Sequence, residues 1–309
     1  MKKISVVVAA FNEEKNIPIL YFELINFFKE TKLQYEIIFI DDASDDTTQT
    51  VIKGLLKSNI VKGYSLKKNS KKAGALELGF QKAQGDIVIT LDADLQDDPK
   101  EMKNLIKEID NGADVVVGWR KERIDSLTKI IPSFAINNMA NFFLGMKFHD
   151  MNTGFKAYRK NVINNISFHG SLFRFIPHLL AAEGFDIREM PIKHRKRKFG
   201  KTKFSWRHRL RSLFDLVTVI FISKFKDSPL HFFGVFGMLF FLLGCGINVY
   251  LSIRWFQGYG IGDRPILFLG MLLMIVGIQI ASIGLIGELI LYLRPKDKIT
   301  QNYVEIRSE

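Results

Sequence analysis

One stretch decides the fold more than any other part of the chain: Asp86-Ile87-Val88-Ile89-Thr90-Leu91-Asp92-Ala93-Asp94-Leu95-Gln96-Asp97-Asp98-Pro99. Its first half is a short apolar run containing β-branched residues, which is typical of a strand buried on both faces. Its second half is acidic and ends at a proline, a residue that often begins a helix. A buried strand, a polar loop and a helix are the repeating unit of a mostly parallel sheet.

The first 125 residues repeat this unit. Strands are predicted at 4–10, 35–40, 61–65, 86–91 and 114–117, and helices at 15–31, 46–57, 73–83 and 99–110. Continuous apolar strands separated by helices predict an α/β domain with a mostly parallel sheet. Ligands bind such sheets beyond the carboxyl ends of the strands. Because acidic clusters at 41–46 and 92–98 both follow strands, we expect them to meet at one edge.

Asp92 and Asp94 stand one residue apart at the end of a strand, and both can address one site if the chain turns there. Such a pair suits a hard divalent cation, whose other ligands are commonly phosphate oxygens of a substrate. Gln96 can add a neutral oxygen. The alternative is a solvated acidic loop followed by a helix start, and we expect that simpler role for Asp97 and Asp98.

The charge balance points to an anionic partner. The chain has 44 basic and 32 acidic residues, for a formal net charge of +12. Nucleic acid, an acidic lipid surface or a phosphorylated substrate would each satisfy this charge. The cations concentrate between Lys193 and Arg211, beside long apolar segments, and no mixed aromatic and basic pattern is present, so we expect no nucleic-acid partner. The single cysteine, Cys245, excludes an intrachain disulfide and fits a reducing cytoplasm.

Two long segments, 230–253 and 265–287, contain no Asp, Glu, Lys or Arg. Each exceeds the ~20 residues that a helix needs to cross a bilayer. The short loop between them predicts a hairpin with both ends on one side of the membrane. The cations before residue 229 and those after residue 293 place that side in the cytoplasm by the positive-inside rule. A buried core hairpin in a soluble protein is the disfavoured alternative.

An amphipathic helix is predicted just before the first span. Its apolar residues recur at helical spacing, as an interfacial helix requires: Leu210, Leu213, Phe214, Val217, Ile220 and Phe221. Polybasic segments beside a span attract anionic lipids by about 1 kcal/mol per residue. We expect Arg207, Arg209 and Arg211 to face anionic membrane lipids, while Arg197 and Lys203 serve a substrate phosphate.

Several motifs make the chain resemble glycosyltransferase family 2, which has the GT-A fold. Within that family it resembles the polyisoprenyl-phosphate glycosyltransferases related to dolichol-phosphate mannose synthase and the bactoprenol glucosyltransferases. The matching motifs, in order, are Ala9-Ala10-Phe11-Asn12-Glu13-Glu14, Asp41-Asp42-Ala43-Ser44-Asp45, Asp92 to Pro99, Gly118-Trp119-Arg120, Asn152 to Arg159, and His194-x-x-Arg197-x-x-Gly200-x-x-Lys203-Phe204. Three places depart from the family pattern. Ala9-Ala10 replaces a proline, Lys71 to Ala75 matches the usual helix entry only approximately, and the tail from Arg294 to Glu309 is similar to the R-P-x-Y ending of bacterial members with an insertion between its parts.

The resemblance implies a set of donor contacts. Asp41 and Asp42 would hold the base and ribose, Asp92 would contact the donor, and Asp94 with Gln96 would hold Mg²⁺ or Mn²⁺ against the diphosphate. The same donor-binding set includes Ala10, Phe11, Glu13 and Ala93. The metal offsets charge on the leaving nucleoside diphosphate, and Arg120 would share that catalytic task. The reaction implied is inverting transfer of a hexose, with UDP-glucose favoured over donors of N-acetylglucosamine, galactose or mannose.

The implied acceptor is a polyisoprenyl phosphate, undecaprenyl phosphate in a bacterium. A phosphate monoester has a second pKa near ~6 and is largely dianionic at neutral pH, so it needs positioning more than deprotonation. The acceptor phosphate would be held by Arg197 and Lys203, both counted as catalytic, with His194 and Arg174. Asp150 either steers the acceptor or acts as a residual base, and the sequence leaves both roles open.

These expectations divide the chain into four parts. They are a GT-A catalytic domain at 1–204, an amphipathic juxtamembrane helix at 205–228, transmembrane helices near 230–254 and 265–290 within 229–293, and a cytoplasmic tail at 294–309. The product would be a sugar-loaded lipid in the cytoplasmic leaflet of the inner membrane, for use in the cell envelope. A processive polysaccharide synthase is disfavoured because it would need a Q-x-x-R-W segment and more spans. A non-catalytic nucleotide-binding membrane module is less favoured still, and so small a hairpin is compatible with a homo-oligomer.

Overall fold

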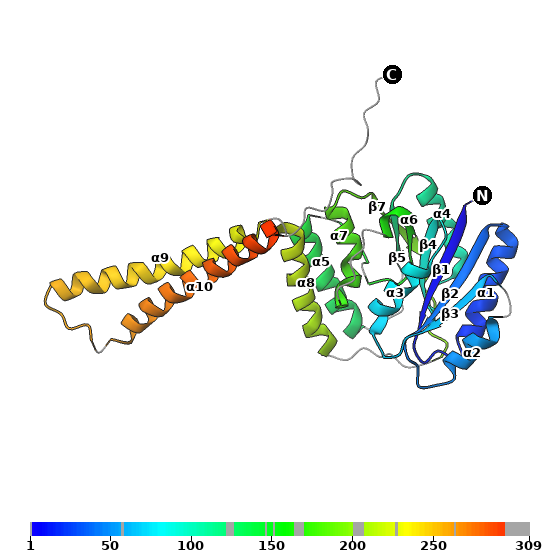
Figure 1. Cartoon of the computed structure of the whole chain (residues 1–309), viewed down its shortest axis with the longest axis horizontal. Coiled ribbons are helices and arrows are strands. Elements are labelled where there is room, and N and C mark those ends of the chain that lie inside the picture. Colours follow the sequence, from blue (N-terminus) through cyan, green and yellow to red (C-terminus); the bar gives the residue numbers. More distant parts are fainter. Residues whose placement is uncertain are drawn as a thin grey trace, which may run out of the picture. The chain divides into compact units, whose positions relative to one another are not determined.

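The computed structural model describes residues 2–56, 59–121, 127–145, 147–150, 152–163, 170–199, 207–225, 228–262 and 264–293. The chain divides into two compact units, Met1–Ile220 and Phe221–Glu309. The first is an α/β unit and the second is dominated by two long helices (Figure 1).

A seven-stranded sheet forms the centre of the first unit, in the order β3-β2-β1-β4-β6-β5-β7. The strands are β1 (Lys3–Ala10), β2 (Gln34–Asp41), β3 (Val61–Ser65), β4 (Ile87–Asp92), β5 (Val115–Arg120), β6 (Lys156–Arg159) and β7 (Ile187–Ile192). Neighbouring strands run parallel except β6, which is antiparallel to both β4 and β5. The predicted mostly parallel sheet is therefore confirmed, with one reversed strand inserted beside β4.

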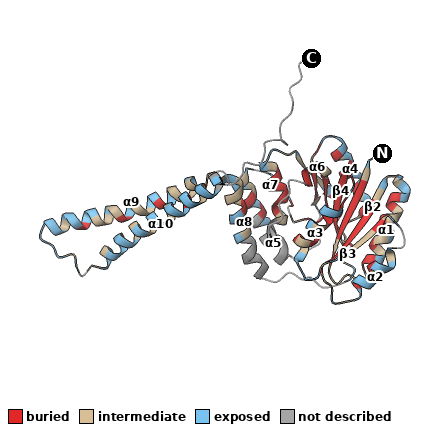
Figure 2. Ribbon diagram, in the orientation of Figure 1, coloured by how far each residue is buried: buried red, intermediate tan, exposed pale blue. Residues whose placement is uncertain are grey.

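Helices cover both faces of this sheet. One face packs against α1 (Ile17–Thr31), α2 (Thr48–Leu55) and α4 (Met102–Asp110), and the other against α3 (Lys71–Lys82), α6 (Lys160–Ile163) and α7 (Ile176–Ala182). Side chains alternate between the two cores, so Val6 belongs to the first and Val7 to the second. Burial on both faces, seen as red strands in Figure 2, explains why the strands read as continuous apolar runs.

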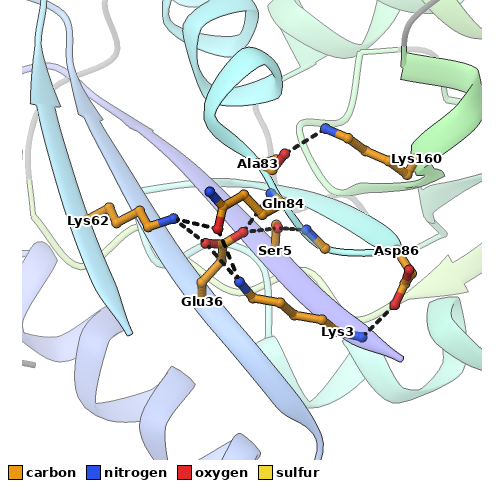
Figure 3. Close-up of polar contacts among 9 residues, drawn as sticks. Lys3, Ser5, Glu36, Lys62, Ala83, Gln84, Asp86 and Lys160 are labelled. Atoms are coloured by element: carbon orange, nitrogen blue, oxygen red, sulfur yellow. Dashed lines mark hydrogen bonds and ion pairs between the residues drawn. The ribbon is translucent and has the colours of Figure 1, made fainter. Parts of the chain in front are cut away.

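A buried charge cluster holds the amino-terminal end of the central strands together (Figure 3). The carboxylate of Glu36 accepts hydrogen bonds from the Ser5 hydroxyl at 2.6 Å, the Gln84 backbone N–H at 2.7 Å and the Lys62 ammonium at 2.7 Å. The Lys3 ammonium lies 3.4 Å away. Burial raises the pKa of Glu36, but the hydrogen bonds from Lys62 and Ser5 outweigh burial and lower the pKa to about 2. Glu36 is therefore an ionised tie between strands.

Two further helices carry apolar side chains in contact with solvent, and one of them, α8, continues from the first unit into the second. On α8 (Arg207–Phe225), Leu216 and Val219 are buried while Phe214 and Val217 are exposed. The exposed pair belongs to the apolar stripe predicted to face the membrane. The sequence did not predict α5 (Leu127–Leu144), which exposes Phe134, Met139, Phe142 and Phe143.

The second unit is a hairpin of α9 (Pro229–Phe256) and α10 (Pro265–Leu293). Glycines line the contact between the two helices: a Cβ added to Gly237 would lie 2.7 Å from the carbonyl oxygen of Gly277, and one added to Gly244 would lie 2.5 Å from that of Gly270. Such close backbone approach is typical of helix pairs in membranes. Both helices are long and apolar enough to cross a bilayer.

Polar groups mark both ends of the hairpin. At the end where α9 begins, the Glu288 carboxylate accepts the backbone N–H of Leu230 at 3.4 Å, one of the N–H groups that a helix start leaves unpaired. At the other end, the guanidinium of Arg254 lies 3.6 Å from the ring centre of Tyr259, and Trp255 is exposed beside it. Tryptophan and tyrosine concentrate where a membrane meets water.

Candidate active site

The carboxyl ends of β1, β2 and β4 lie side by side. Ala10 of β1 pairs with Asp41 of β2, and Ala9 pairs with Asp92 of β4. The prediction that the two acidic clusters share one edge of the sheet is therefore confirmed. Ala10 and Ala93 are buried in this edge, which leaves their backbone groups as the parts available to a ligand.

Asp41 and Asp42 shape the loop after β2. One oxygen of Asp41 accepts the Ser44 hydroxyl and the other accepts the Ser65 hydroxyl, at 2.5 and 2.9 Å. Asp42 accepts the backbone N–H of Ser70 at 2.7 Å, at the start of α3. Both carboxylates are buried, and burial raises the pKa of Asp42 against the opposing hydrogen bonds from α3. These contacts join the ends of β2 and β3 to the start of α3.

The loop after β1 lies against the loop after β2. The backbone N–H of Asn12 donates to the Ser44 hydroxyl and the Asn12 side chain accepts the N–H of Asp45, each at 2.9 Å. Asn12 has a φ of 54°, a left-handed conformation that asparagine tolerates well. Phe11 and Glu13, the other residues predicted to bind the donor here, are half-buried on either side of it.

The loop after β4 continues to alternate between buried and accessible side chains. Ala93, Leu95 and Asp97 are buried, while Asp92, Asp94, Gln96 and Asp98 are half-buried. Leu95 has a φ of 63°, so the chain turns within the loop as predicted. The alternation directs the side chains of Asp92, Asp94 and Gln96 away from the core.

The prediction that Asp97 belongs to a solvated acidic loop was wrong. Its carboxylate is buried and its backbone forms an isolated bridge with His194. Burial, helped by the negative charge of Asp92, raises the pKa of Asp97 to about 7. Asp98 does begin a helix as predicted, since its side chain accepts the N–H of Lys100 at 3.0 Å at the start of the 3-10 turn η1 (Pro99–Glu101).

Three carboxylates at this edge are each paired with a cation. The pairs are Asp92 with Lys72 of α3, Asp94 with Arg197, and Asp150 with Arg120 of β5. The Asp94–Arg197 distance is 2.5 Å. Arg120 grips Asp150 with two nitrogens, Nε at 2.6 Å and Nη2 at 3.0 Å, the bidentate geometry that gives strong pairing.

The environments of Asp92 and Asp94 push their pKa values in opposite directions. Desolvation raises the pKa of Asp92, but the charge of Lys72 and its hydrogen bond outweigh desolvation and the pKa is lowered. Desolvation and the negative charge of Asp92 raise the pKa of Asp94, against the opposing charge of Arg197. Adjacent carboxylates divided in this way are typical of functional sites.

Asp94 and Gln96 fit a divalent cation. Nη2 of Arg197, which donates to Asp94, also donates to the side-chain oxygen of Gln96 at 3.4 Å, so both residues direct oxygens at one positive centre. Oxygen ligands of this kind suit Mg²⁺ or Mn²⁺. No group of three or more His, Cys, Asp or Glu side chains in the described residues forms a complete metal site. Phosphate oxygens of a substrate would supply the missing ligands.

Gly154 explains part of the Asn152–Arg159 motif. A Cβ at this position would lie within 2.6 Å of the carboxylate atoms of Asp92. The carbonyl oxygen of Gly154 accepts the buried Thr90 hydroxyl of β4 at 2.7 Å. The start of the motif is therefore fastened to β4, and only glycine leaves room for Asp92.

Asp150 is held by elements that sequence reasoning missed. Glu189 of β7 accepts its backbone N–H at 3.2 Å. On α5, the side-chain amides of Asn137 and Asn141 donate to the carbonyl oxygen of Phe148 at 2.5 and 2.7 Å. These partners are distant in sequence, so no local pattern could have found them.

A second group of polar residues lies on the α7 side of the sheet. Burial, and secondarily the positive charge of Lys72, lower the pKa of Lys156 of β6 to about 7. His178 of α7 is fully buried, its ring nitrogens have no hydrogen-bond partner within the described part of the chain, and burial lowers its pKa to about 4. Sequence analysis included Lys156 only as a member of the Asn152 to Arg159 motif and gave it no role. It did not identify His178, because a lone histidine in an apolar segment carries no motif.

Arg174 lies near the Lys72–Asp92 pair. It belongs to the 3-10 helix η2 (Gly170–Phe175), and its guanidinium lies 5.8 Å from the ring centre of Phe173, while the Lys72 ammonium lies 5.9 Å from the same ring. Burial lowers the pKa of Arg174, and Asp215 of α8 opposes that effect.

His194 and Arg195 fasten the basic segment to the acidic loop. The N–H of Arg195 donates to the carbonyl oxygen of Gln96 at 2.8 Å, and its guanidinium pairs with Glu23 at 2.9 Å and Asp98 at 2.5 Å. This contact brings Arg197 to Asp94. Gly200, Lys203 and Phe204, also part of the predicted site, lie outside the described residues.

Comparison with known proteins identifies relatives along the whole chain. The chain is 31% identical to the dodecaprenyl-phosphate galacturonate synthase of Rhizobium johnstonii, over 98% of this chain and 91% of that protein. It is 30% identical to the undecaprenyl-phosphate 4-deoxy-4-formamido-L-arabinose transferase of Klebsiella pneumoniae, over 94% of this chain and 88% of that protein. Both are polyisoprenyl-phosphate glycosyltransferases by name, which confirms the resemblance drawn from the motifs.

Solved structures and a family model agree with these relatives. Mannosyl-3-phosphoglycerate synthase from Rubrobacter xylanophilus has a TM-score of 0.56 at 16% identity, over 71% of this chain and 73% of that one. Glucosyl-3-phosphoglycerate synthase from Mycobacterium tuberculosis, solved with Mn²⁺, uridine diphosphate and phosphoglyceric acid, has a TM-score of 0.55 at 18% identity, over 74% and 81%. At these identities the likeness shows the GT-A fold alone. The model for "Glycosyl transferase family 2" matches residues 5–167, and with the full-length relatives it shows that this chain belongs to that family.

Proposed function

We propose that this enzyme transfers a sugar from a nucleoside diphosphate sugar to a polyisoprenyl phosphate at the cytoplasmic surface of the inner membrane. The observation that carries the proposal is the set of cation-paired carboxylates at the carboxyl edge of the sheet, in a chain with two membrane-length helices. Both named relatives act on a prenyl phosphate, and the chain covers most of their length.

The donor is assigned to the loops after β1, β2 and β4. Asp41 and Asp42 line the place for the nucleoside, with Ala10, Phe11 and Glu13 on the neighbouring loop and Ala93 beneath. Asp94 and Gln96 hold Mg²⁺ or Mn²⁺, which offsets charge on the departing diphosphate. Asp92, fixed by Lys72 and seated against Gly154, orients the sugar side of the donor.

The acceptor phosphate is assigned to the cations near Asp150. The acceptor residues predicted from the sequence are Arg174, His194, Arg197 and Lys203. Arg120, predicted from the sequence to act on the leaving diphosphate, is assigned here to the acceptor because it pairs with Asp150. A phosphate dianion attacks without losing a proton, so the role of these cations is to orient it in line with the anomeric carbon.

Asp150 acts on Arg120 rather than as a base in this scheme. Its two oxygens accept Nε and Nη2 of Arg120, and one of them also accepts the N–H of Asn152 at 3.1 Å. A carboxylate engaged in this way is suited to fixing a guanidinium. Asp150 would therefore position the acceptor through Arg120.

The membrane supplies the acceptor. The chain passes from α8 into α9 within a few residues, so the end of α8 stays close to the bilayer surface. The exposed apolar residues of α8 and α5 are suited to an interfacial position. The cations of 207–211, whose side chains lie outside those that the structure describes, are assigned to anionic lipids from the sequence alone. We place both termini in the cytoplasm on the positive-inside rule.

A donor panel tests the proposal and settles the sugar. UDP-glucose, UDP-galacturonate, UDP-N-acetylglucosamine, UDP-galactose and GDP-mannose are each incubated with the full-length enzyme, Mn²⁺ and undecaprenyl phosphate in vesicles. We expect one donor to give a single-sugar lipid, with UDP-glucose the first to be tried and UDP-galacturonate the main competitor. Equal transfer to undecaprenol, which lacks the phosphate, would contradict the proposal.

A further inference from the structure

Arg197 stands where a divalent cation would bind. Its Nη2 nitrogen lies 2.5 Å from an oxygen of Asp94 and 3.4 Å from the side-chain oxygen of Gln96. Asp94 and Gln96 would offer these same oxygens to Mg²⁺ or Mn²⁺, so the metal and the guanidinium would compete for them. Two cations held by the same oxygens repel strongly, so the guanidinium and the metal exclude one another at this place.

The backbone near Arg197 is fixed, although Arg197 itself lies in no helix or strand. Arg195, two residues earlier, is tied to Gln96 through its backbone and to Glu23 and Asp98 through its guanidinium. Residues 195–199 have no regular secondary structure, and the Arg197 side chain is 27% exposed. Rotation of the Arg197 side chain would free Asp94 without movement of the sheet.

The Arg120–Asp150 pair shows what a fixed pair looks like at the same edge. Its guanidinium uses two nitrogens on one carboxylate, and the two side chains are 13% and 3% exposed. Nη2 of Arg197 is instead shared between oxygens of two different residues, and the Arg197 side chain is more exposed, at 27%. The geometry therefore separates a fixed cation from an exchangeable one.

We infer that Arg197 is an exchangeable counter-ion: it occupies the oxygens of Asp94 and Gln96 until a divalent cation takes them, and is then released toward the acceptor phosphate. This inference rests on the proposed function, which assigns the metal to Asp94 and Gln96 and the phosphate to Arg197. It deepens that function by coupling the two sites. Because such coupling is reciprocal, metal and acceptor each strengthen the binding of the other.

Metal binding in the presence of uridine diphosphate, whose phosphate oxygens supply the ligands that Asp94 and Gln96 lack, tests the exchange directly. Free Mn²⁺ is measured by its electron paramagnetic resonance signal over full-length protein in zwitterionic nanodiscs. We expect Arg197→Gln to bind Mn²⁺ about tenfold more tightly than wild type, because an internal competitor is gone. Arg195→Gln removes the same charge nearby but contacts Glu23 and Asp98, so its affinity should stay within about twofold of wild type. Arg197→Lys, which keeps the charge, should fall between wild type and Arg197→Gln.

Acceptor binding gives an independent measurement. Calorimetry with farnesyl phosphate, with and without Mn²⁺, should show at least about fivefold tighter binding with metal in wild type and less than about twofold in Arg197→Gln. Any direct contact between Mn²⁺ and the phosphate persists in both proteins, so the difference isolates Arg197.

Two results would overturn the exchange and are distinguishable. If Asp94→Asn abolishes Mn²⁺ binding but Arg197→Gln binds no more tightly than wild type, the exchange is wrong and the metal site stands. If Asp94→Asn binds Mn²⁺ as wild type does, the assignment of the metal in the proposed function fails, and the exchange fails with it.

Discussion

The two ends of the central strands both hold buried carboxylates paired with cations, but the pairs are built differently. At the amino end, Glu36 is tied to Lys62 of the neighbouring strand and its pKa is lowered to about 2. At the carboxyl end, Asp94 is tied to Arg197 of a segment without helix or strand, and its pKa is raised. The first carboxylate is satisfied by a rigid sheet and the second by a side chain able to leave. Both carboxylates form an ion pair, so the pair itself does not distinguish a structural carboxylate from a candidate functional one. The difference is whether the cation belongs to a rigid strand or to a segment without regular structure.

The largest effect is expected when Asp94 and Glu36 are each replaced by the corresponding amide, which tests whether the first is functional and the second structural. We expect Asp94→Asn to lower turnover roughly 10³-fold, since a metal contributes several kcal/mol to the transition state. Glu36→Gln should change turnover less than about twofold at a temperature where it is folded. Initial rates of lipid-linked sugar formation measure both. A similar loss in the two variants would mean that the two ends of the sheet do not differ in role.

The second test asks whether Asp92 must keep its position against Gly154. Gly154→Ala places a methyl group against the Asp92 carboxylate and should lower kcat/KM for the donor about 10²-fold, because displacement by about 1 Å is enough for such a loss. Gly54→Ala on α2 is the matched control, since an added Cβ there meets nothing within 4 Å. Normal kinetics in Gly154→Ala would show that Asp92 need not hold its position.

Asp150→Asn separates positioning from base catalysis. If Asp150 fixes Arg120, the loss should be about tenfold and appear mainly in KM for the acceptor, because the amide keeps one hydrogen-bond acceptor for the guanidinium. Loss of a general base would instead lower kcat by ~10²–10⁴-fold. Steady-state kinetics against undecaprenyl phosphate distinguish the two.

The structural role of Glu36 can be measured through protein stability. Glu36→Gln should lower the free energy of unfolding by about 2 kcal/mol, because the Lys62 ammonium and the Gln84 N–H lose a charged acceptor. Thermal denaturation in detergent should show a melting temperature about 5 °C lower. Asp94→Asn should melt close to wild type, since the loss of its ion pair with Arg197 is offset by removal of a buried charge and of the repulsion between Asp94 and Asp92.

Low pH should also remove the stabilisation that Glu36 provides. The folded pKa of Glu36, about 2, lies below its ordinary value of 4.5, so its stabilisation is present above pH 4.5 and is lost as the pH falls toward 2. The loss amounts to about 3 kcal/mol at most. The melting temperature of wild type should therefore fall more steeply than that of Glu36→Gln across this range. Glu77→Gln, on the exposed side of α3, should follow wild type.

Local patterns in the sequence were enough for the first five strands of the sheet, the hairpin and the meeting of the acidic clusters, but not for β6 and β7. Apolar runs of strand length and the two charge-free segments are properties of contiguous residues, which tertiary contacts seldom override. The same reasoning failed for Asp97, whose acidic neighbours indicated solvation. Its burial depends on the bridge to His194 from the far end of the domain, which no local pattern reports.

Local sequence patterns also could not predict the residues that hold the site residues in place. Lys72 belongs to a helix entry that matched the family only approximately, yet it pairs with Asp92. Glu189 and the α5 asparagines hold the segment around Asp150 from positions that carry no motif. Helix α5 escaped prediction because its polar and apolar residues do not separate cleanly onto two faces. The residues proposed to meet substrates follow strand ends, whereas those that hold them are defined only by the fold.

The length of the hairpin helices has a consequence for the lipid environment. At 1.5 Å per residue, the charge-free stretches 230–253 and 265–287 within α9 and α10 span about 35 Å, against ~30 Å for the hydrocarbon core of a bilayer. This hydrophobic mismatch is relieved by tilt or by projection of the helix ends, with Trp255 and Tyr259 anchoring the far end. Membrane thickness would therefore set the hairpin's inclination, making lipid chain length a physical variable for this enzyme.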